Sequence, residues 1–325
     1  IILTLLAVFF LFFSIKKKLT YFYSNKITLI FIFFCLTLIF SSLLSEYVIY
    51  SLTQGESLFF IRFFLFSLLI CYFAQLNYEF YLYLAYSFLF CILILVIDGS
   101  FQYFTGVNLF GIEAGRSRLT GLFIDEPIIG RYVSTSAMLA SSLLFFYSRK
   151  MNKNYNLLII IILFVSLIFT FMTGERVPFG ALFGFILVCF ILIDRKWLVK
   201  ILTITFIFFS IYFLISNHER SQDRTLETFH DLNLREFKFM IATPVHDAHY
   251  KSAILMFKDH PFFGIGSNLF RKYCDYENYI VKIPKHYDSS SCTTHPHNYY
   301  FQILAENGIF GLIIFTLLFL ILSFR

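Results

Sequence analysis

The sequence predicts an all-α polytopic membrane protein with about nine transmembrane helices. Hydrophobic residues make up 58% of its 325 residues, and the chain contains 47 Phe. A soluble domain of this length would not carry so much apolar surface. Apolar runs also recur at about the 20-residue length that a helix needs to cross the hydrocarbon core of a bilayer. Because a backbone in lipid must satisfy its own hydrogen bonds, these runs are expected to be helices.

Nine apolar segments fit this description. They lie at roughly 1–15, 27–44, 57–74, 80–97, 128–147, 157–172, 177–193, 198–216 and 298–323. The predicted division is eight transmembrane helices at 1–217, a loop or cap at 218–297, and a ninth helix at 298–325. The sequence starts at Ile1 rather than Met and stops at Arg325, just past an apolar run, so we expect both ends to be truncated.

Basic residues in the short loops predict how the helices are oriented. Lys and Arg gather in the loops near 16–26, 149–153 and 195–200. Cytoplasmic loops carry an excess of these residues. Alternation then directs the loops near 98–127, 173–176 and 218–296 outward. The net charge of +6 reflects this loop bias and does not predict a nucleic-acid partner.

Segment 218–297 differs in composition from the rest of the chain. It contains all eight His, together with ten Lys or Arg and ten Asp or Glu. An apolar stripe predicts a helix over 247–259. Pro261 is expected to end this helix, because proline lacks the N–H group and clashes with the preceding turn. Gly264 and Gly266 indicate a turn, and we interpret the whole segment as a partly helical cap that faces outward.

Two of the six cysteines lie in this cap, and the other four lie in apolar segments. The outer side of the membrane is oxidising, so Cys274 and Cys292 are candidates for a disulfide, with two free thiols as the alternative. Cys292, His295 and His297 also form a Cys-x-x-His-x-His pattern. A zinc site normally needs four ligands, and no second pair stands at a matching spacing. We therefore predict no metal site.

His297 is the strongest candidate for acid–base chemistry. It precedes the last apolar segment, and His is the side chain that best takes up a proton near neutral pH. Pro296 stiffens the approach to the helix, and Asn298 can cap it. Gly308 and Gly311 would let another helix approach closely. The alternative is an interfacial histidine that only ends the helix.

Arginines in the predicted outer loops or at helix ends are candidates for binding a lipid pyrophosphate. The planar guanidinium can donate two parallel hydrogen bonds to phosphate. These residues are Arg116, Arg118 and Arg176. A plain ion pair, for example with the neighbouring Glu175, is the alternative for Arg176. Arg62 and Glu306 lie inside apolar runs, where a charge needs a partner or a cavity.

Four sequence elements resemble those of the O-antigen ligase and polymerase family. His297-Asn298, nine residues, Gly308, two residues and Gly311 resemble its His-[Asn/Ser/Gln]-x9-Gly-x-x-Gly signature. Residues 249–266 resemble a helix followed by Pro-x-x-Gly-x-Gly. Residues 173–176, Thr-Gly-Glu-Arg, are similar to a Ser/Thr-x-x-Arg element, and residues 118–123 are similar to Arg-x-x-Gly-x-Phe. The related region covers about 116–311.

This resemblance implies a metal-independent, GT-C-like membrane glycosyltransferase that uses no cofactor. The donor would be a polyprenyl-pyrophosphate-linked glycan, and the acceptor a sugar hydroxyl of lipid A core or of another lipid-linked glycan. The reaction would take place at the periplasmic face of the bacterial inner membrane, among membrane lipids. Ligases, polymerases and protein O-oligosaccharyltransferases share these residues and differ in the acceptor.

The resemblance also assigns roles to individual residues. By position, His297 would be the general base and Arg176 would hold the pyrophosphate. Ligases carry a further loop arginine upstream of the Pro-x-x-Gly element, and here that place falls to His246 or Lys251. The other candidates for substrate binding or support are Arg116, Arg118, Asn298, His295, Glu306 and Arg62.

Two other functions remain open from the sequence. A transporter or flippase for lipid-linked glycans predicts inverted repeats and charged sites near the bilayer midplane. The sequence has no evident repeat, and most polar candidates gather at one face. A non-catalytic membrane subunit would need no histidine cluster. The enzyme interpretation predicts that Arg118, Arg176 and His297 meet at one outward cavity.

Overall fold

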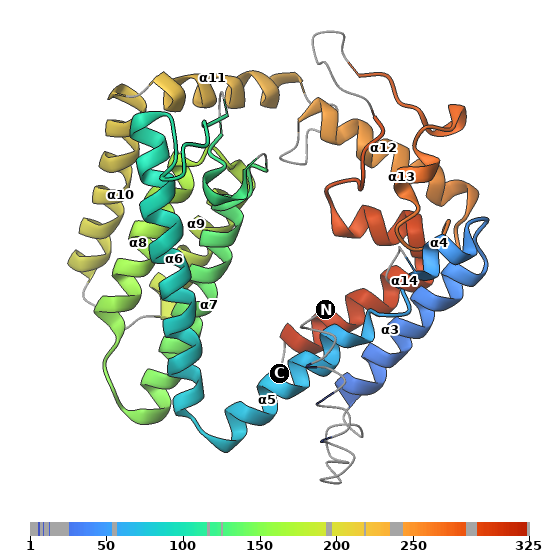
Figure 1. Cartoon of the computed structure of the whole chain (residues 1–325), viewed down its shortest axis with the longest axis horizontal. Coiled ribbons are helices and arrows are strands. Elements are labelled where there is room, and N and C mark those ends of the chain that lie inside the picture. The colour runs from blue at the N-terminus through green and yellow to red at the C-terminus, as the bar shows by residue number, and fades with distance from the viewer. Residues whose placement is uncertain are drawn as a thin grey trace. The chain divides into compact units, whose positions relative to one another are not determined.

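The structure is a computed structural model of an almost entirely helical chain (Figure 1). It describes residues 6, 9, 13, 26–53, 57–115, 118–124, 126–192, 197–217, 219–234, 243–283 and 291–323. Within these residues there is no β-sheet, only an isolated bridge between Val107 and Glu113. The chain forms two compact units. Unit 1 comprises residues 1–72 and 230–325, and unit 2 comprises residues 73–229.

Unit 2 is a helical bundle built around α7. Its helices are α6 (Glu79–Thr105), α7 (Ile129–Met151), α8 (Asn156–Met172), α9 (Arg176–Leu192) and α10 (Trp197–Asn217), followed by most of α11 (Glu219–Leu234). A short 3₁₀ turn, η1 (Gly121–Phe123), precedes α7. Helix α7 packs against α6, α8 and α9. Small buried residues on α7, among them Ala137, Ala140 and Ser141, allow this close packing.

Unit 1 brings the two ends of the sequence together. It contains α3 (Lys26–Leu43), α4 (Val48–Thr53), most of α5 (Ile61–Leu76), α12 (Pro244–Asp259), α13 (Phe270–Tyr273), η2 (Glu277–Tyr279) and α14 (Tyr299–Ser323). Helix α3 runs along α14, and α12 packs against the start of α14 (Figure 1). Phe34, Leu38 and Ile303 form the apolar contact between α3 and α14.

The predicted apolar segments correspond to helices along most of the chain. Eight of them coincide with α3, α5, α6, α7, α8, α9, α10 and α14, and most of segment 1–15 lies outside the described residues. By length and composition, α3, α6 and α14 can each cross a membrane, and four shorter apolar helices accompany them. The all-helical membrane character is therefore confirmed, whereas the count of nine crossings stays a prediction.

Helix α12 begins and ends close to where the sequence predicts. It starts at Pro244, three residues before the predicted Asp247, because Thr243 caps it by accepting the His246 N–H on its side chain. Proline at the first position suits a helix, since that N–H would have no partner inside the helix. Pro261 stands two positions after Asp259, the last residue of α12, as expected. Three α-helices were not predicted, namely α4 in the loop near 45–56, the polar helix α11 and the four-residue α13.

Helix α14 is interrupted, although the sequence predicts one continuous helix over 298–323. Gly308 has φ 64° and ψ −165°, a conformation outside the helical region and open mainly to glycine. The first N–H after the interruption, that of Ile309, donates to the carbonyl oxygen of Pro261 at 2.9 Å. The prediction of a continuous helix was wrong because its hydrogen bonds pass to a segment far away in the sequence.

The same segment also satisfies the carbonyl groups that precede the interruption. The N–H groups of Ile265 and Gly266 donate to the carbonyl oxygens of Ala305 and Glu306 at 3.0 and 2.9 Å. A Cβ on Gly264 would lie 2.3 Å from the backbone of Glu306. The Pro-x-x-Gly-x-Gly element therefore fits into the break of α14, so this element and the His297 signature form one structural unit. Buried backbone groups need such partners, above all within a membrane.

Candidate functional site

Four histidines of unit 1 lie close together where α12 meets the loop before α14. The ring centroid of His297 lies 4.4 Å from that of His295, 5.2 Å from that of His246 and 5.5 Å from that of His249. His246 and His249 come from α12, and the other two come from the loop that leads into α14. Tyr250 stacks on Phe301 with centroids 4.7 Å apart, which joins the two helices beneath the cluster.

His297 is held by its backbone, while its side chain is exposed. Its φ is 56°, a left-handed conformation that few residues other than glycine adopt. The preceding Pro296 is buried, and Asn298 caps α14 by accepting the N–H groups of Tyr300 and Phe301 at 2.9 and 3.3 Å. The predicted cap by Asn298 is confirmed. The backbone at His297 is therefore held on both sides, by the buried Pro296 and by the capped start of α14.

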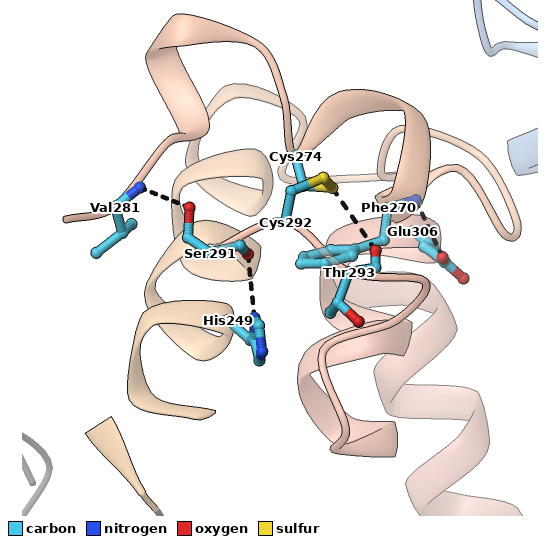
Figure 2. The surroundings of a disulfide bond; sticks show 8 residues. All are labelled: His249, Phe270, Cys274, Val281, Ser291, Cys292, Thr293 and Glu306. Atoms are coloured by element: carbon cyan, nitrogen blue, oxygen red, sulfur yellow. Dashed lines mark hydrogen bonds between the residues drawn. A yellow bond between two sulfur atoms is a disulfide. The ribbon is translucent and has the colours of Figure 1, made fainter. Parts of the chain in front are cut away.

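His249 is the buried member of the cluster. Only 4% of it is exposed, and its Nδ1 lies 3.0 Å from the carbonyl oxygen of Ser291 (Figure 2). Burial, together with the charges of the nearby His246, His297 and His295, lowers the pKa of His249 to about 3. His249 is therefore neutral at any physiological pH.

A disulfide joins Cys274 and Cys292 beside this cluster (Figure 2). The two Cα atoms are 4.8 Å apart, and Cys274 lies in the core around α12 and α13. Ser291, next to Cys292, also accepts the Val281 N–H on its hydroxyl at 3.0 Å. Because Cys292 is bonded to sulfur, it cannot supply the thiolate of a Cys-x-x-His-x-His metal site.

Glu306 supports the fold around the interruption of α14. It is buried, and it accepts hydrogen bonds from the Phe270 N–H and the Gln302 side chain, both at 3.2 Å. Its backbone carbonyl also accepts from the hydroxyl of Ser41 in α3 at 2.7 Å. Glu306 therefore links α3, α13 and α14, and the sequence could not identify these partners.

In unit 2, the two arginine-bearing elements are joined to each other. The N–H of Leu119, next to Arg118, donates to the carbonyl oxygen of Thr173 at 3.1 Å. Arg118 and Arg131 both act electrostatically on Glu175, which lies one residue before Arg176. Four charged residues from three separate stretches of the sequence thus belong to one region, which we call the arginine cluster: Arg118, Arg131, Glu175 and Arg176.

Glu175 organises the arginine cluster. It is 8% exposed, and its carboxylate accepts the N–H groups of Gly130 and Arg131 at the start of α7, the second at 3.2 Å. A Cβ on Gly130 would lie 2.8 Å from Glu175 Oε1, so only glycine permits this approach. Burial raises the pKa of Glu175, whereas these two N–H groups and the charges of Arg118 and Arg131 lower it. No local sequence pattern predicts this helix cap, since donor and acceptor are about 45 residues apart.

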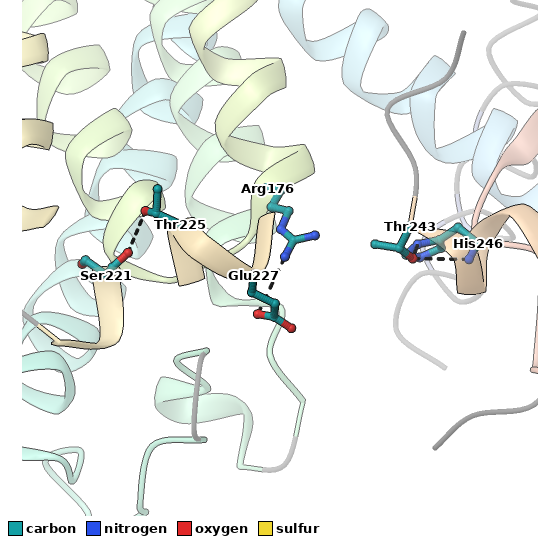
Figure 3. A network of polar contacts seen from close by, with 6 residues as sticks. All are labelled: Arg176, Ser221, Thr225, Glu227, Thr243 and His246. Carbon is teal, nitrogen blue, oxygen red and sulfur yellow. Dashed lines mark hydrogen bonds and ion pairs between the residues drawn. The ribbon is translucent and has the colours of Figure 1, made fainter. Parts of the chain in front are cut away.

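Arg176 begins α9, and one of its ion-pair partners is Glu227 on α11. The distance from Nη2 to Oε2 is 3.7 Å, and the two side chains are 23% and 48% exposed (Figure 3). The neighbouring Glu175, whose ion pair with Arg176 was the alternative interpretation, directs its carboxylate to the start of α7. A half-exposed ion pair is weak, so a phosphate could replace Glu227 on Arg176.

A buried amide network positions the loop that carries Arg118. Oε1 of Gln102, near the end of α6, accepts the N–H groups of Thr120 and Gly121 at 3.1 and 2.8 Å. Nδ2 of Asn108 donates to the carbonyl oxygen of Gly121 at 3.0 Å. Polar residues at a helix end do not reveal such partners, so the sequence missed Gln102 and Asn108.

The remaining predicted residues lie in different places. Arg116 lies outside the described residues. Lys251 is partly buried on α12, and His246 forms a hydrogen bond with Thr243 through Nδ1 at 2.8 Å (Figure 3). The guanidinium of Arg62 on α5 lies over the Phe63 ring at 5.0 Å. The histidines belong to unit 1 and the arginine cluster to unit 2, and their meeting at one cavity stays a prediction.

A comparison with models of known families matches a region that contains most of the candidate site residues. Residues 161–316 match the family model described as O-antigen ligase. Comparisons with curated proteins and with solved structures gave no match. The matched region includes Arg176, the Pro261–Gly266 element and the His297 signature, whereas Arg118 precedes it. The recognition of this family is therefore confirmed over residues 161–316, which make up just under half of the chain.

Proposed function

We propose that this protein transfers a polyprenyl-pyrophosphate-linked oligosaccharide or polysaccharide to a sugar hydroxyl of an acceptor glycan. The transfer takes place at the periplasmic face of the inner membrane, during synthesis of lipopolysaccharide or another surface polysaccharide. The observation that carries this proposal is the exposed imidazole of His297, held by a strained backbone at the start of an apolar helix inside the region that matches the family.

In this proposal, His297 is the general base. Its imidazole takes the proton of the acceptor hydroxyl as the oxygen bonds to the anomeric carbon of the donor sugar. The bond from that carbon to the pyrophosphate oxygen breaks, and polyprenyl pyrophosphate leaves. General base catalysis of this kind contributes typically about 10²- to 10⁴-fold to the rate. His246, His295, Lys251 and Asn298 are proposed to line the same acceptor and glycan site.

The arginine cluster is proposed to hold the pyrophosphate. The leaving group already departs readily, so it needs stabilisation of its negative charge more than a proton. Arg176 and Arg118 supply this charge, and Arg116 lies in the same loop as Arg118. A divalent metal would then be unnecessary, because the positive guanidinium groups stabilise the negative charge of the pyrophosphate in its place.

The test is a transfer assay with purified protein in proteoliposomes, a lipid-pyrophosphate-linked glycan donor and defined acceptors. His297→Ala is expected to reduce transfer by at least about 100-fold, since the base is lost. His260→Ala is the matched control, because His260 is an exposed histidine of the same unit at the end of α12. Its activity is expected to equal that of the unmodified protein.

The outcomes separate the candidate functions. Full transfer activity of the His297→Ala variant, or donor translocation without glycan transfer, would contradict the proposed reaction. Acceptors that carry lipid A core, a second lipid-linked glycan or a peptide distinguish ligase, polymerase and protein O-oligosaccharyltransferase activity. Chelation of divalent metals is expected to leave the rate unchanged.

A further inference from the structure

His249 has a feature that general base catalysis by His297 does not by itself require. A solvated histidine can carry its proton on either ring nitrogen, and its neighbours decide which. The Nδ1 of His249 lies 3.0 Å from the carbonyl oxygen of Ser291. A carbonyl oxygen only accepts hydrogen bonds, so Nδ1 must carry the hydrogen. In a neutral imidazole, the other nitrogen, Nε2, is then an unprotonated acceptor.

The hydroxyl contacts of the other two histidines near His297 do not impose this constraint. His246 and His295 contact the hydroxyl groups of Thr243 and Thr294 at 2.8 and 2.9 Å. A hydroxyl can donate or accept, so these contacts leave the tautomer of either ring open. Within the cluster, His249 is therefore the ring whose acceptor nitrogen is defined by its hydrogen bond.

The Ser291 carbonyl is itself held in place. The adjacent Cys292 is bonded to Cys274, and the Ser291 hydroxyl accepts the Val281 N–H (Figure 2). Ser291 is 3% exposed, and His249 is buried on α12 beside it. This covalent and hydrogen-bonded support fixes both the place and the tautomer of His249.

We propose that His249 is a positioning residue that orients His297. The ring centroids are 5.5 Å apart and the planes are inclined by 49°, a separation at which facing ring nitrogens come within hydrogen-bond reach. The unprotonated Nε2 of His249 accepts an N–H of His297. The second nitrogen of His297 then carries a lone pair directed to the acceptor hydroxyl. This inference rests on the proposed role of His297 as the base.

The charge of His249 matters as much as its place. A carboxylate there would hold a proton on His297 and reduce the supply of free base. A neutral acceptor orients the ring with a weaker effect on its protonation. The groups that face His297 are the rings of His246, His249 and His295, and α12 also carries Asp247 and Tyr250 next to its two histidines in the sequence.

Two substitutions separate the function of each nitrogen. In His249→Asn, the amide N–H occupies the place of Nδ1–H and can keep the bond to Ser291, but nothing replaces Nε2. In His249→Gln, an amide oxygen reaches the place of Nε2 and can accept from His297. Both are compared with His297→Ala and with the control His260→Ala in the same proteoliposome assay, from pH 5 to pH 9.

His249→Asn is expected to lower kcat on the order of 10- to 100-fold, with the KM for the donor unchanged, because the base is misoriented. The acid limb of its kcat profile should move to lower pH, since protonated His297 loses an acceptor. His249→Gln should recover part of both effects. A merely structural role would not move the pH profile or respond to the amide oxygen.

Failure of this inference can be told apart from failure of the proposed function. If His249→Asn kept the kcat and the pH profile of the unmodified protein while His297→Ala was inactive, only the positioning role of His249 would be overturned. An active His297→Ala variant would overturn the role of His297 as the base.

Nitrogen NMR of ¹⁵N-histidine-labelled protein tests the hydrogen bond between His249 and His297 without an activity measurement. We expect a His249 that stays neutral at pH 5 and a His297 signal that shifts in His249→Asn. Titration of His249 near pH 6.5, or an unshifted His297, would contradict the inference.

Discussion

The two units hold their functional side chains by opposite electrostatic means. In unit 1, the imidazole of His249 beside His297 is kept neutral by burial, and a backbone carbonyl and a neighbouring disulfide support His249. In unit 2, a buried carboxylate, Glu175, lies among arginines and a helix N-terminus. A base must be free of its proton to act, so low local charge suits it. Arginines repel one another, so a central anion is needed to gather them before a phosphate arrives.

The units also differ in how they stabilise irregular backbone. In unit 1, helix α14 is interrupted, and the glycine-rich segment 261–266, at least 40 residues earlier in the sequence, supplies hydrogen-bond partners at the interruption. Unit 2 leaves its helices intact and instead caps them with side chains from other elements, such as Glu175 and Gln102. Unit 1 should therefore respond mainly to changes in backbone shape and redox state, and unit 2 to changes in charge.

The largest effect is expected from Gly308→Ala in unit 1. A Cβ at this position would lie 2.2 Å from the carbonyl oxygen of Phe262, and its φ of 64° disfavours any side chain. We expect a loss of roughly 3 kcal/mol or more of folding stability, and little folded protein. Gly180→Ala is the matched control, because no atom lies within 4 Å of its Cβ position. The measurements are the yield of protein in detergent and its thermal unfolding. Similar results for both variants would contradict the tight fit of segment 261–266 against α14 at Gly308.

Removal of the disulfide should be the next largest effect, and again it concerns unit 1. We expect the Cys274→Ser, Cys292→Ser double variant to lose about 3 kcal/mol, the size expected for a closed loop of roughly this length. Its kcat should fall as well, because Ser291 no longer holds His249 firmly. Thermal unfolding with and without reductant measures the first effect. Cys71→Ser, which removes an exposed free thiol, serves as the control. An unmodified protein insensitive to reductant, with both thiols free to label, would contradict the bond.

In unit 2, Glu175→Gln should weaken donor binding without unfolding the bundle. The amide keeps one acceptor for the start of α7 but loses the charge that gathers the arginines. We expect the donor KM to rise by about 10-fold, equivalent to about 1.4 kcal/mol, with a smaller change in kcat. Glu126→Gln, an exposed carboxylate in the preceding loop, is the control. An unchanged donor KM in Glu175→Gln would show that the anion does not organise the cluster.

A pH dependence of stability is also expected, and it belongs to unit 1. The pKa of His249 is about 3 in the folded protein, below the 6.5 of an unperturbed histidine. Between these values the unfolded chain binds a proton at His249 that the folded chain does not. Stability should therefore fall as the pH decreases from 6.5, by at most about 1.4 kcal/mol per pH unit from this group. Denaturant unfolding at pH 7.5 and pH 5 should show a smaller difference in His249→Asn than in the unmodified protein.

The sequence by itself determined the features that depend on residues close together in the chain. Apolar runs located the helices from α5 to α10, and Pro261 marked the end of α12. The spacing after His297 indicated the family, and Asn298 was recognised as a helix cap from its neighbours alone. These features depend on residues within one or two helical turns, so the order of residues is sufficient to read them.

Only the tertiary structure decided which of these elements belong together. The break at Gly308 depends on Pro261, the cap of α7 depends on Glu175, and the hydroxyl of Ser41 bonds to Glu306 across 265 positions. Sequence patterns report hydrophobicity and local hydrogen bonding, and they carry no record of which distant donor meets which acceptor. The tautomer of His249 is of the same kind, since a carbonyl 42 residues away determines it.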